Sequence, residues 1–580
     1  MRFELNWCQL CHWGLLGAAG VVHAVDLPPY AQDLFDESMV FQDAIYDPTA
    51  AYLHYFYYPL AAGAHETRSS VWYAAGLLQR NRGDDVHEAV RILENVIGVQ
   101  EKDPSVLWYG DYTKYPEQPT VGSAAYPAVI YNSWDPNWRG FIGTALIVIY
   151  EEFRPLLPAH LPSLILDSLY NNTIGDSYRV GGVDNDNLYP AYSNAWLMRT
   201  VVTSWTGRQF QDRNMSAAGD ASARAFLALF NTTDTLSEFN GPTYAGVSLY
   251  ALTLAAKYLS PSSPSSTNTS ANPSTTTTTT TATPLIGQHA PALIQTIWTT
   301  TAQLWHPTLR NLAGPWDRTY GYDMTNYVAI MSLWIWAIVG KTHAYPPSTQ
   351  PIYTLAHADD FEIAPLLAIL APFHKTLLPD SILTRLTSLP STLSSNASAS
   401  YIYKAHTYAP PADLTPRTIT TFLSPNLTIG TFSYNQSTIG GFSKDSTSYS
   451  PAVIQWLRPR DNSVGYMSLI PSEAALCAEV EPYRVSLSYP DGNASSVFEF
   501  AVAVNPLHGV RDVGGLEDVE GVDVRVAGGT VEGVPLVGFC GLLGGVCEPV
   551  HGFEVWKFRF SMPAGSVEVP RLVLEFGFGG

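Results

Sequence analysis

Apolar residues recur at three- and four-residue spacing from Glu66 to about Leu370, in segments bounded by Pro, Gly, Asp or Asn. This spacing is typical of amphipathic α-helices, whose buried face repeats about every 3.6 residues. It predicts ten helices joined mostly by short links, at residues 65–82, 84–100, 138–154, 159–171, 189–207, 216–230, 242–259, 289–305, 323–340 and 360–372.

After Tyr401 the pattern changes to short alternating stretches rich in Val, Phe and Tyr, such as 496–504 and 555–560, with Gly and Asp turns between them. Alternation of this kind predicts antiparallel strands. Consecutive helices with short links form antiparallel hairpins, which either close into an (α/α) toroid or stack as an open solenoid. We therefore expect an α+β chain, with a catalytic (α/α) toroid at 25–395 and an antiparallel β-sandwich-like domain at 400–580.

Two segments are not expected to belong to either domain. Residues 1–24 contain a short apolar stretch followed by Val22-His23-Ala24, the small-residue cleavage pattern of a secretory signal peptide. Residues 260–284 are rich in Ser, Pro and Thr and cannot bury enough apolar area to fold, which predicts a disordered insertion suited to O-glycosylation.

The leader predicts a secreted, extracellular glycoprotein with no membrane span, because its apolar run is too short and no later one reaches about 20 residues. Eight acceptor sequons for N-glycosylation agree with this route, at Asn171, Asn214, Asn231, Asn268, Asn396, Asn426, Asn435 and Asn493.

Composition narrows the class of partner. Lys and Arg total 31 against 51 Asp and Glu, and the net charge of -20 opposes binding to nucleic-acid phosphate or to an anionic membrane. Only 14% of residues are charged while 12% are aromatic, a balance that suits stacking on neutral polar rings. A polysaccharide is therefore the expected partner, and no nucleic acid is expected.

The cysteines predict one small loop. Cys8 and Cys11 lie in the leader, and Cys540 and Cys547 flank a Gly-rich turn that a disulfide would close in an oxidising compartment. Cys477 is then left over, and we expect it to be buried.

No cofactor and no metal site are expected from motifs. The chain has no phosphate-binding Gly loop, no HExxH helix and no GxSxG elbow. His357, Asp359 and Asp360 carry metal-ligating groups, but a loop that caps the following helix is the favoured interpretation.

Polar and aromatic residues crowd the start of every second predicted helix. In an alternating antiparallel array these starts point to the same end, so the residues converge on one concave site. Helix capping accounts for many of the polar groups but not for the aromatic and Arg side chains beside them. The candidates are His65, Trp134, Trp138, Arg139, Asn185, Asp186, Tyr192, Glu238, Asn240, Tyr244, Asp317, Arg318 and Tyr322.

Two of these segments, 237–244 (SEFNGPTY) and 314–322 (GPWDRTYGY), carry a resemblance. With the helical array and the C-terminal β-domain, the chain resembles secreted (α/α)-toroid carbohydrate-active enzymes, most of all polysaccharide lyases of the alginate, glucuronan and heparinase type. The resemblance implies β-elimination from a uronate-containing polymer. The chain departs from the lyase pattern because no histidine lies beside Asn240 and Tyr244.

β-Elimination needs a group that stabilises the uronate carboxylate, a base for the C5 proton and an acid for the leaving oxygen. We expect Asn240 to steady the carboxylate, Tyr244 to act as acid and also as base, and Arg318 to supply positive charge. His65 is the best histidine for a base. Substrate binding is expected from Trp134, Trp138, Arg139, Asn185, Asp186, Tyr192, Asp317 and Tyr322.

Two alternatives remain open. A glycoside hydrolase needs two carboxylates across the scissile bond, and Glu238, Asp186 and Asp317 are candidates for them. A secreted glycoprotein that keeps the scaffold without the chemistry is the other. Trp108 lies in the long connection before the third helix and is either part of a sugar-stacking wall or of a packed loop.

Overall fold

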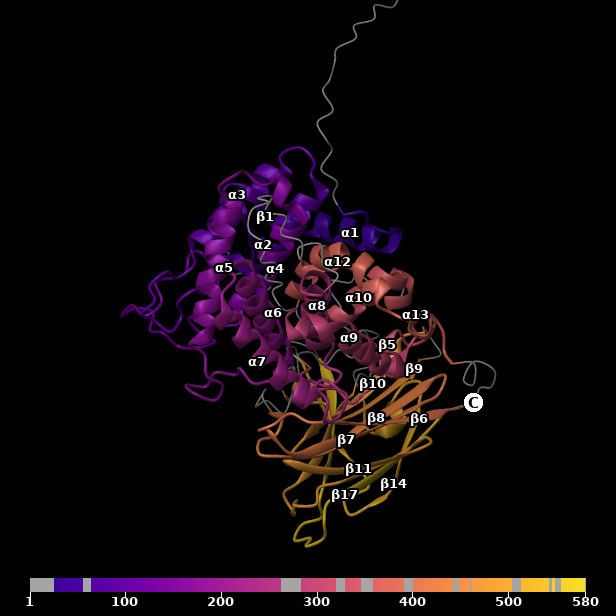
Figure 1. Cartoon of the computed structure of the whole chain (residues 1–580). Helices are drawn as coiled ribbons and strands as arrows, with labels where there is room; N and C mark the ends of the chain where they lie inside the picture. The colour runs from indigo at the N-terminus through magenta and orange to yellow at the C-terminus, as the bar shows by residue number, and fades with distance from the viewer. Residues whose placement is uncertain are drawn as a thin grey trace, which may run out of the picture.

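The computed structural model describes residues 25–55, 64–261, 283–319, 329–345, 358–390, 400–441, 448–458, 462–502, 513–541, 545–547 and 554–578. The leader at 1–24, most of the insertion at 260–284 and Tyr322 lie outside the described residues. Helices gather in one half of the molecule and strands in the other (Figure 1). The α+β class expected from the pattern is confirmed.

Helices occur throughout the described part of the chain from residue 29 to residue 387, and most of them overlap a predicted segment. Short 3₁₀ turns at Arg154–Leu156 (η1) and Ala358–Ile363 (η4) accompany them. The α-helices are α1 (Pro29–Ile45), α2 (Thr67–Arg80), α3 (Asp85–Gly98), α4 (Trp138–Phe153), α5 (Leu161–Ser177), α6 (Ser193–Gln209), α7 (Arg213–Phe230), α8 (Pro242–Tyr258), α9 (Leu285–Leu304), α10 (Ala329–Val339), α11 (Lys341–Ala344), α12 (Ala364–Thr376) and α13 (Asp380–Thr387).

Helix α1 is an element that the sequence pattern did not predict. Its buried face includes the apolar Leu34, Phe35 and Met39, but also the polar Ser38 and Gln42, so the apolar stripe is interrupted. The Gln42 amide nitrogen donates to the backbone oxygen of Glu362 at 2.6 Å. This bond joins the first described helix to the segment that enters α12.

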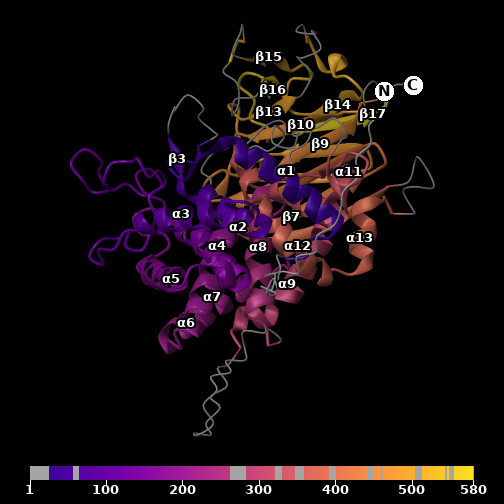
Figure 2. The same ribbon diagram turned by 90° about the horizontal axis from the view of Figure 1, so that it is seen from above.

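The helices pack in a recurring order. Helices α2, α4, α6, α8, α10 and α12 each contact the next in this series, and α12 contacts α2. Helices α3, α5, α7 and α9 each pack on the helix that precedes them in the chain. Seen from above, α2, α4, α8 and α12 lie close together (Figure 2).

Close approach between successive members of the series depends on glycine. A Cβ on Gly140 in α4 would lie 3.1 Å from Met198 in α6, and one on Gly246 in α8 would lie 2.5 Å from Ile330 in α10. Each contact joins the early turns of the two helices, so α4 and α6 run in the same direction. Their N-terminal ends therefore lie at the same end of the array.

The second half of the chain is a curled antiparallel sheet. Within the part of the chain that the structure describes, twelve strands join it in the order β14-β17-β12-β11-β8-β9-β10-β13-β16-β15, with β7 also paired to β8 and β6 to β7. Its strands are β6 (Tyr401–Thr407), β7 (Asp413–Leu423), β8 (Leu427–Gln436), β9 (Ala452–Leu457), β10 (Val464–Pro471), β11 (Ala475–Glu481), β12 (Arg484–Ser488), β13 (Val497–Val502), β14 (Asp523–Gly529), β15 (Leu536–Cys540), β16 (Val555–Ser561) and β17 (Arg571–Gly577).

Two small sheets lie within the helical half. Strands β1 (Tyr46–Asp47), β2 (Tyr52–His54) and β3 (His65–Glu66) form a three-stranded antiparallel sheet directly before α2. Strands β4 (Trp305–His306) and β5 (Asn311–Leu312) form a hairpin after α9.

The two halves meet through buried polar groups. The Arg417 guanidinium in β7 is 1% exposed and donates to Asp413 in its own strand at 2.8 Å. It also donates to Asp317 at 3.0 Å and to the Ser237 backbone oxygen at 2.8 Å, both from the helical half. Trp316 forms a β-bridge with Ser450. The segments around residues 237 and 317 are thereby fixed between helices and sheet.

One pair of cysteines is bonded as the sequence predicts, and Cys477 is free. Cys540 and Cys547 form a disulfide. The expectation that Cys477 is buried is wrong, because its thiol is exposed. Strand β11 turns Leu476 and Val480 toward the core, and Cys477 lies on the opposite face of the pleat.

Candidate functional site

The first turns of α2 and α4 lie against each other. The Trp138 indole nitrogen donates to the Thr67 hydroxyl at 3.2 Å. The Arg68 guanidinium lies 4.6 Å from the ring centroid of Trp138 and 5.0 Å from that of Trp72. A cation enclosed by aromatic rings keeps its charge while it closes the gap between the two helices.

The first turns of α6 and α8 meet in a second aromatic group. Tyr192 immediately precedes α6 and Tyr244 lies in the first turn of α8, with ring centroids 6.2 Å apart. The Arg318 guanidinium lies 4.5 Å from the Tyr192 ring centroid and 4.2 Å from that of Tyr244. Three segments distant in sequence thus place one cation against two phenol rings.

Glu238 is the ion-pair partner of this cation. Its carboxylate accepts from the Arg318 Nη1 at 2.9 Å and from the Ser193 hydroxyl at 2.9 Å. The Asn194 side chain donates to the same carboxylate at 3.0 Å and its backbone N–H at 3.2 Å. Glu238 is 2% exposed, so its carboxylate is enclosed. It therefore holds Arg318 and the start of α6 in position.

Asn240 is tied to the neighbouring chain segment. Its amide nitrogen donates to the backbone oxygens of Ala313 at 2.8 Å and Pro315 at 3.0 Å. Its backbone has a φ of 54°, the left-handed conformation that asparagine tolerates better than most residues. The side-chain amide of Asn240 therefore donates to the backbone of the segment that leads to Arg318.

Two further acids flank the group. Burial raises the pKa of Asp317 to about 6, and the Arg417 guanidinium opposes this rise. Asp360, in η4, accepts from the Thr243 hydroxyl at 2.8 Å and so links the entry to α12 with the first turn of α8.

Other predicted residues hold the loops that lead into α4 and α6. Arg139 is fully buried and donates to the backbone oxygens of Leu107 and Tyr109 at 3.0 and 2.9 Å. Asp186 pairs bidentately with Arg179 at 2.8 and 3.0 Å. Asn185 is exposed.

Trp134 borders a cavity of about 210 Å³. Trp108 lies on the same cavity, with its ring centroid 6.2 Å from that of Trp134. Asp111 also faces it, and neither of its carboxylate oxygens makes a well-aligned hydrogen bond to the described residues. Burial raises the pKa of Asp111 to about 8.

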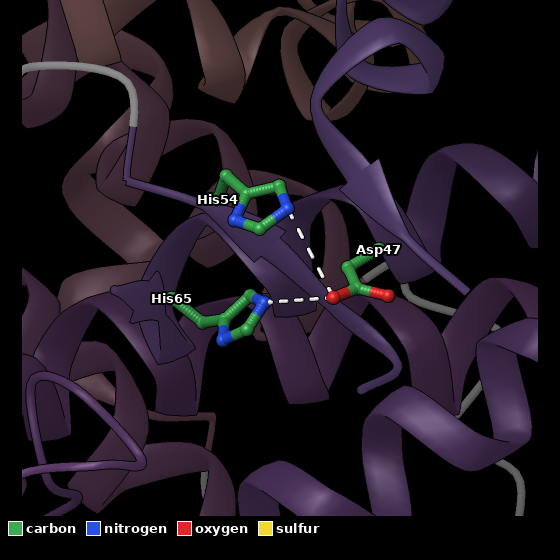
Figure 3. A group of neighbouring side chains, drawn as sticks. All are labelled: Asp47, His54 and His65. Atoms are coloured by element: carbon green, nitrogen blue, oxygen red, sulfur yellow. Dashed lines mark hydrogen bonds and ion pairs between the residues drawn. The ribbon is translucent and has the colours of Figure 1, made fainter. Parts of the chain in front are cut away.

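His65 belongs to a separate group at the small sheet before α2. Its Nε2 lies 3.3 Å from the Asp47 Oδ2, and its ring stacks on His54 with centroids 4.6 Å apart (Figure 3). The Glu117 carboxylate contacts the Nδ1 of the same ring. The backbone N–H groups of Thr49 and Ala50 hold the pKa of Asp47 below its ordinary value.

The predicted residues thus fall into several groups. Tyr192, Glu238, Asn240, Tyr244, Asp317 and Arg318 gather at the junction of α6, α8 and the sheet, whereas Trp138 and His65 lie at the start of α2, in different contacts. Asn194 was not predicted because its role depends on Glu238, 44 residues away. Arg417, Asp47 and His54 were missed for the same reason, since each acts through partners that only the fold brings close.

These residues define a two-part α+β protein with a polar and aromatic group of side chains where its helical half meets its sheet. The chain belongs to the family described as "Domain of unknown function (DUF8769)", which matches residues 32–372, more than half of its length. A second family, "Domain of unknown function (DUF8770)", matches residues 399–577. No curated protein matches the chain. Within the described residues, no helix is long and apolar enough to cross a membrane.

Proposed function

We propose that this protein is a secreted carbohydrate-active enzyme, a polysaccharide lyase that cleaves a uronate-containing polymer at the junction of an (α/α) toroid and a β-sandwich-like domain. The observation that carries the proposal is the contact of Arg318 with Tyr244 and Tyr192. A phenol beside a fixed positive charge is suited to proton transfer at a sugar ring. The recurring order of helix contacts, which returns from α12 to α2, supports the toroid.

In this proposal Tyr244 takes the C5 proton and delivers a proton to the leaving oxygen, while the C4–O bond breaks and the C4–C5 double bond forms. Arg318 favours the negative charge that develops on the substrate. Asn240 keeps a smaller role than the sequence suggested, because its amide nitrogen donates to the backbone oxygens of Ala313 and Pro315. We assign the uronate carboxylate to the N-terminal end of α8, where the helix dipole favours an anion beside Tyr244. Asn240 then fixes the position of that turn.

The arrangement of carboxylates favours a lyase over a glycoside hydrolase. Glu238 is held by Arg318, Asp317 by Arg417, and Asp186 by Arg179. A hydrolase needs one carboxyl group free to protonate the leaving oxygen and another free to face the sugar. Carboxylates that are buried in ion pairs serve neither purpose well.

Export is supported by where the sequons fall. Among the described residues, Asn171 is half-buried and accepts from the Tyr109 hydroxyl, whereas the other sequon asparagines are exposed, namely Asn214, Asn231, Asn426, Asn435 and Asn493. Glycans at these positions would extend into solvent without displacing packed side chains.

The test uses the purified full chain and a panel of neutral and uronate-containing polysaccharides. We expect an increase in ultraviolet absorbance from a C4–C5 unsaturated uronate with at least one acidic polymer, and none with a neutral glucan. New reducing ends without that chromophore would show hydrolysis and overturn the lyase assignment. Heat-denatured protein is the control.

A further inference from the structure

The small sheet before α2 delivers one metal-ligating side chain from each strand. Asp47 ends β1, His54 ends β2 and His65 begins β3. In the antiparallel register His54 lies directly opposite His65, which accounts for the stacking of their rings. Strand β1 pairs with the other edge of β2 and brings Asp47 to the same group.

The ligand atoms of these side chains converge. The Asp47 Oδ2 lies 3.3 Å from the His65 Nε2 and 3.9 Å from the His54 Nε2. All three atoms lie within 4.8 Å of one another. Ligand atoms around a tetrahedral Zn²⁺, with bonds of about 2.0–2.1 Å, are about 3.3–3.4 Å apart. To complete this geometry the exposed His54 ring moves closer, by about 0.5 Å toward Asp47 and by up to about 1.4 Å toward His65.

Neighbouring groups orient two of the three ligands. The Asp47 Oδ1 accepts from the backbone N–H groups of Thr49 and Ala50 at 2.8 and 3.3 Å, which leaves Oδ2 facing the imidazoles. The Glu117 carboxylate contacts the His65 Nδ1 and so fixes the ring with its Nε2 on the side of Asp47, where that nitrogen is available as a ligand. A carboxylate behind a metal-binding histidine is a common feature of zinc sites, where it fixes the tautomer and raises ligand basicity.

The site also has a route to solvent. The His65 side chain is 9% exposed, whereas the His54 side chain is 46% exposed. Figure 3 shows both rings turned toward Asp47 from the same side of the small sheet. An ion can therefore enter past His54 and reach a ligand that is already enclosed.

We propose that Asp47, His54 and His65 bind Zn²⁺, with Glu117 as the positioning residue of His65. Two imidazoles and one carboxylate are preferred zinc ligands and leave a fourth position for water. No local sequence motif indicates this site, because strand register assembles it. The proposal is independent of the lyase assignment, since zinc uptake requires no substrate.

The test measures zinc uptake by the full chain after removal of metals with a chelator. We expect one Zn²⁺ per chain by elemental analysis after dialysis, and a higher melting temperature in the presence of Zn²⁺ but not of Mg²⁺. Asp47→Asn should abolish stoichiometric uptake while its remaining oxygen still accepts from Thr49 and Ala50, so the turn is kept. Glu117→Gln should weaken binding by about 10–100-fold.

His160→Ala is the matched control, because His160 is an exposed histidine that also pairs with a glutamate, Glu94. It should bind zinc as the wild type does. His54→Ala gives a second variant at an exposed position and should lose uptake without loss of folding. The proposal is overturned if the wild type takes up no Zn²⁺, or if Asp47→Asn and His54→Ala both retain it with wild-type affinity.

Discussion

The guanidinium of Arg318 lies 4.2 Å from the ring centroid of Tyr244, although 74 positions separate the two residues in the chain. Glu238 holds the other side of the same guanidinium at 2.9 Å. The cation is therefore fixed in place before any ligand arrives, and it costs no further ordering when charge develops beside it.

Replacement of Tyr244 by Phe tests the proposed proton donor. The change removes one oxygen and little volume, so the melting temperature should stay within a few degrees of the wild type. Turnover on the acidic polymer should fall by roughly 10²–10⁴-fold, as is typical when a general acid-base group is lost. Tyr170→Phe, at an exposed tyrosine of α5, is the control and should keep full activity. Full activity in Tyr244→Phe would remove Tyr244 from the mechanism.

Arg318→Met should destabilise the protein by about 3–5 kcal/mol, because it leaves the Glu238 carboxylate buried without its cation. Urea unfolding measures the change. Adding Glu238→Gln to Arg318→Met should restore part of the loss, since the uncompensated charge is then gone. If the two losses simply add, the ion pair does not link the two residues energetically.

Glu238→Gln by itself separates the two enzyme classes. In a lyase it should reduce stability by roughly 1.5–3 kcal/mol, the range for a hydrogen bond to a charged group, and only weaken turnover. A hydrolase that used this carboxylate as acid or nucleophile would lose its activity altogether. Turnover is measured at a temperature where the variant is fully folded by circular dichroism.

The buried carboxyl group of Asp111 should make the free energy of unfolding of the protein depend on pH. Its pKa is raised from 3.8 to about 8, so folding favours the protonated acid. The resulting stabilisation is fully present below about pH 4 and is lost as the pH rises through 8. Asp111→Asn removes this titration, and the variant should gain stability relative to the wild type between pH 5 and about pH 9. Urea unfolding across that range checks it, and a constant difference between the two proteins would contradict it.

Arg417→Met tests the contact between the two halves. The guanidinium bonds Asp413, Asp317 and the Ser237 backbone, and its loss leaves two carboxylates buried together. We expect a loss of about 3–5 kcal/mol and separation of thermal unfolding into two transitions by calorimetry. Arg525→Met, at an exposed arginine of β14 paired with Glu575, should have little effect.

Much of the helical half could be predicted because its signal is local. The predicted helix at 242–259 and the observed α8 at Pro242–Tyr258 differ by one residue at one end, since Pro242 marks the start and an apolar face continues to the last turn. Helix α1 was not predicted because the polar residues Ser38 and Gln42 occupy buried positions where an apolar stripe would have apolar side chains. Gln42 donates to the Glu362 backbone in another part of the fold, whereas Ser38 donates to the Phe35 backbone oxygen within α1.

The candidate site was predictable only in part, for a related reason. Residue type and helix position pointed to Tyr244 and Arg318, and the structure brings them together. Residue type and helix position do not show that Arg139 and Asp186 are buried in contacts with neighbouring loop residues. They also do not show that four hydrogen-bond donors enclose the Glu238 carboxylate. Availability to a ligand depends on neighbours distant in sequence, and a single sequence carries little information about them.

The bond from Gln42 to the backbone of Glu362 spans 320 positions of the chain. Helix α1 is synthesised before α10 and α12, the two helices whose surface covers it, and most of the helical half lies between them in the chain. Long-range closure of this kind slows folding, because the ordering of a long loop precedes the contacts that compensate for it. During synthesis the apolar face of α1 therefore stays uncovered until α12 has been made, and an apolar face that is exposed in this way favours aggregation of the incomplete chain.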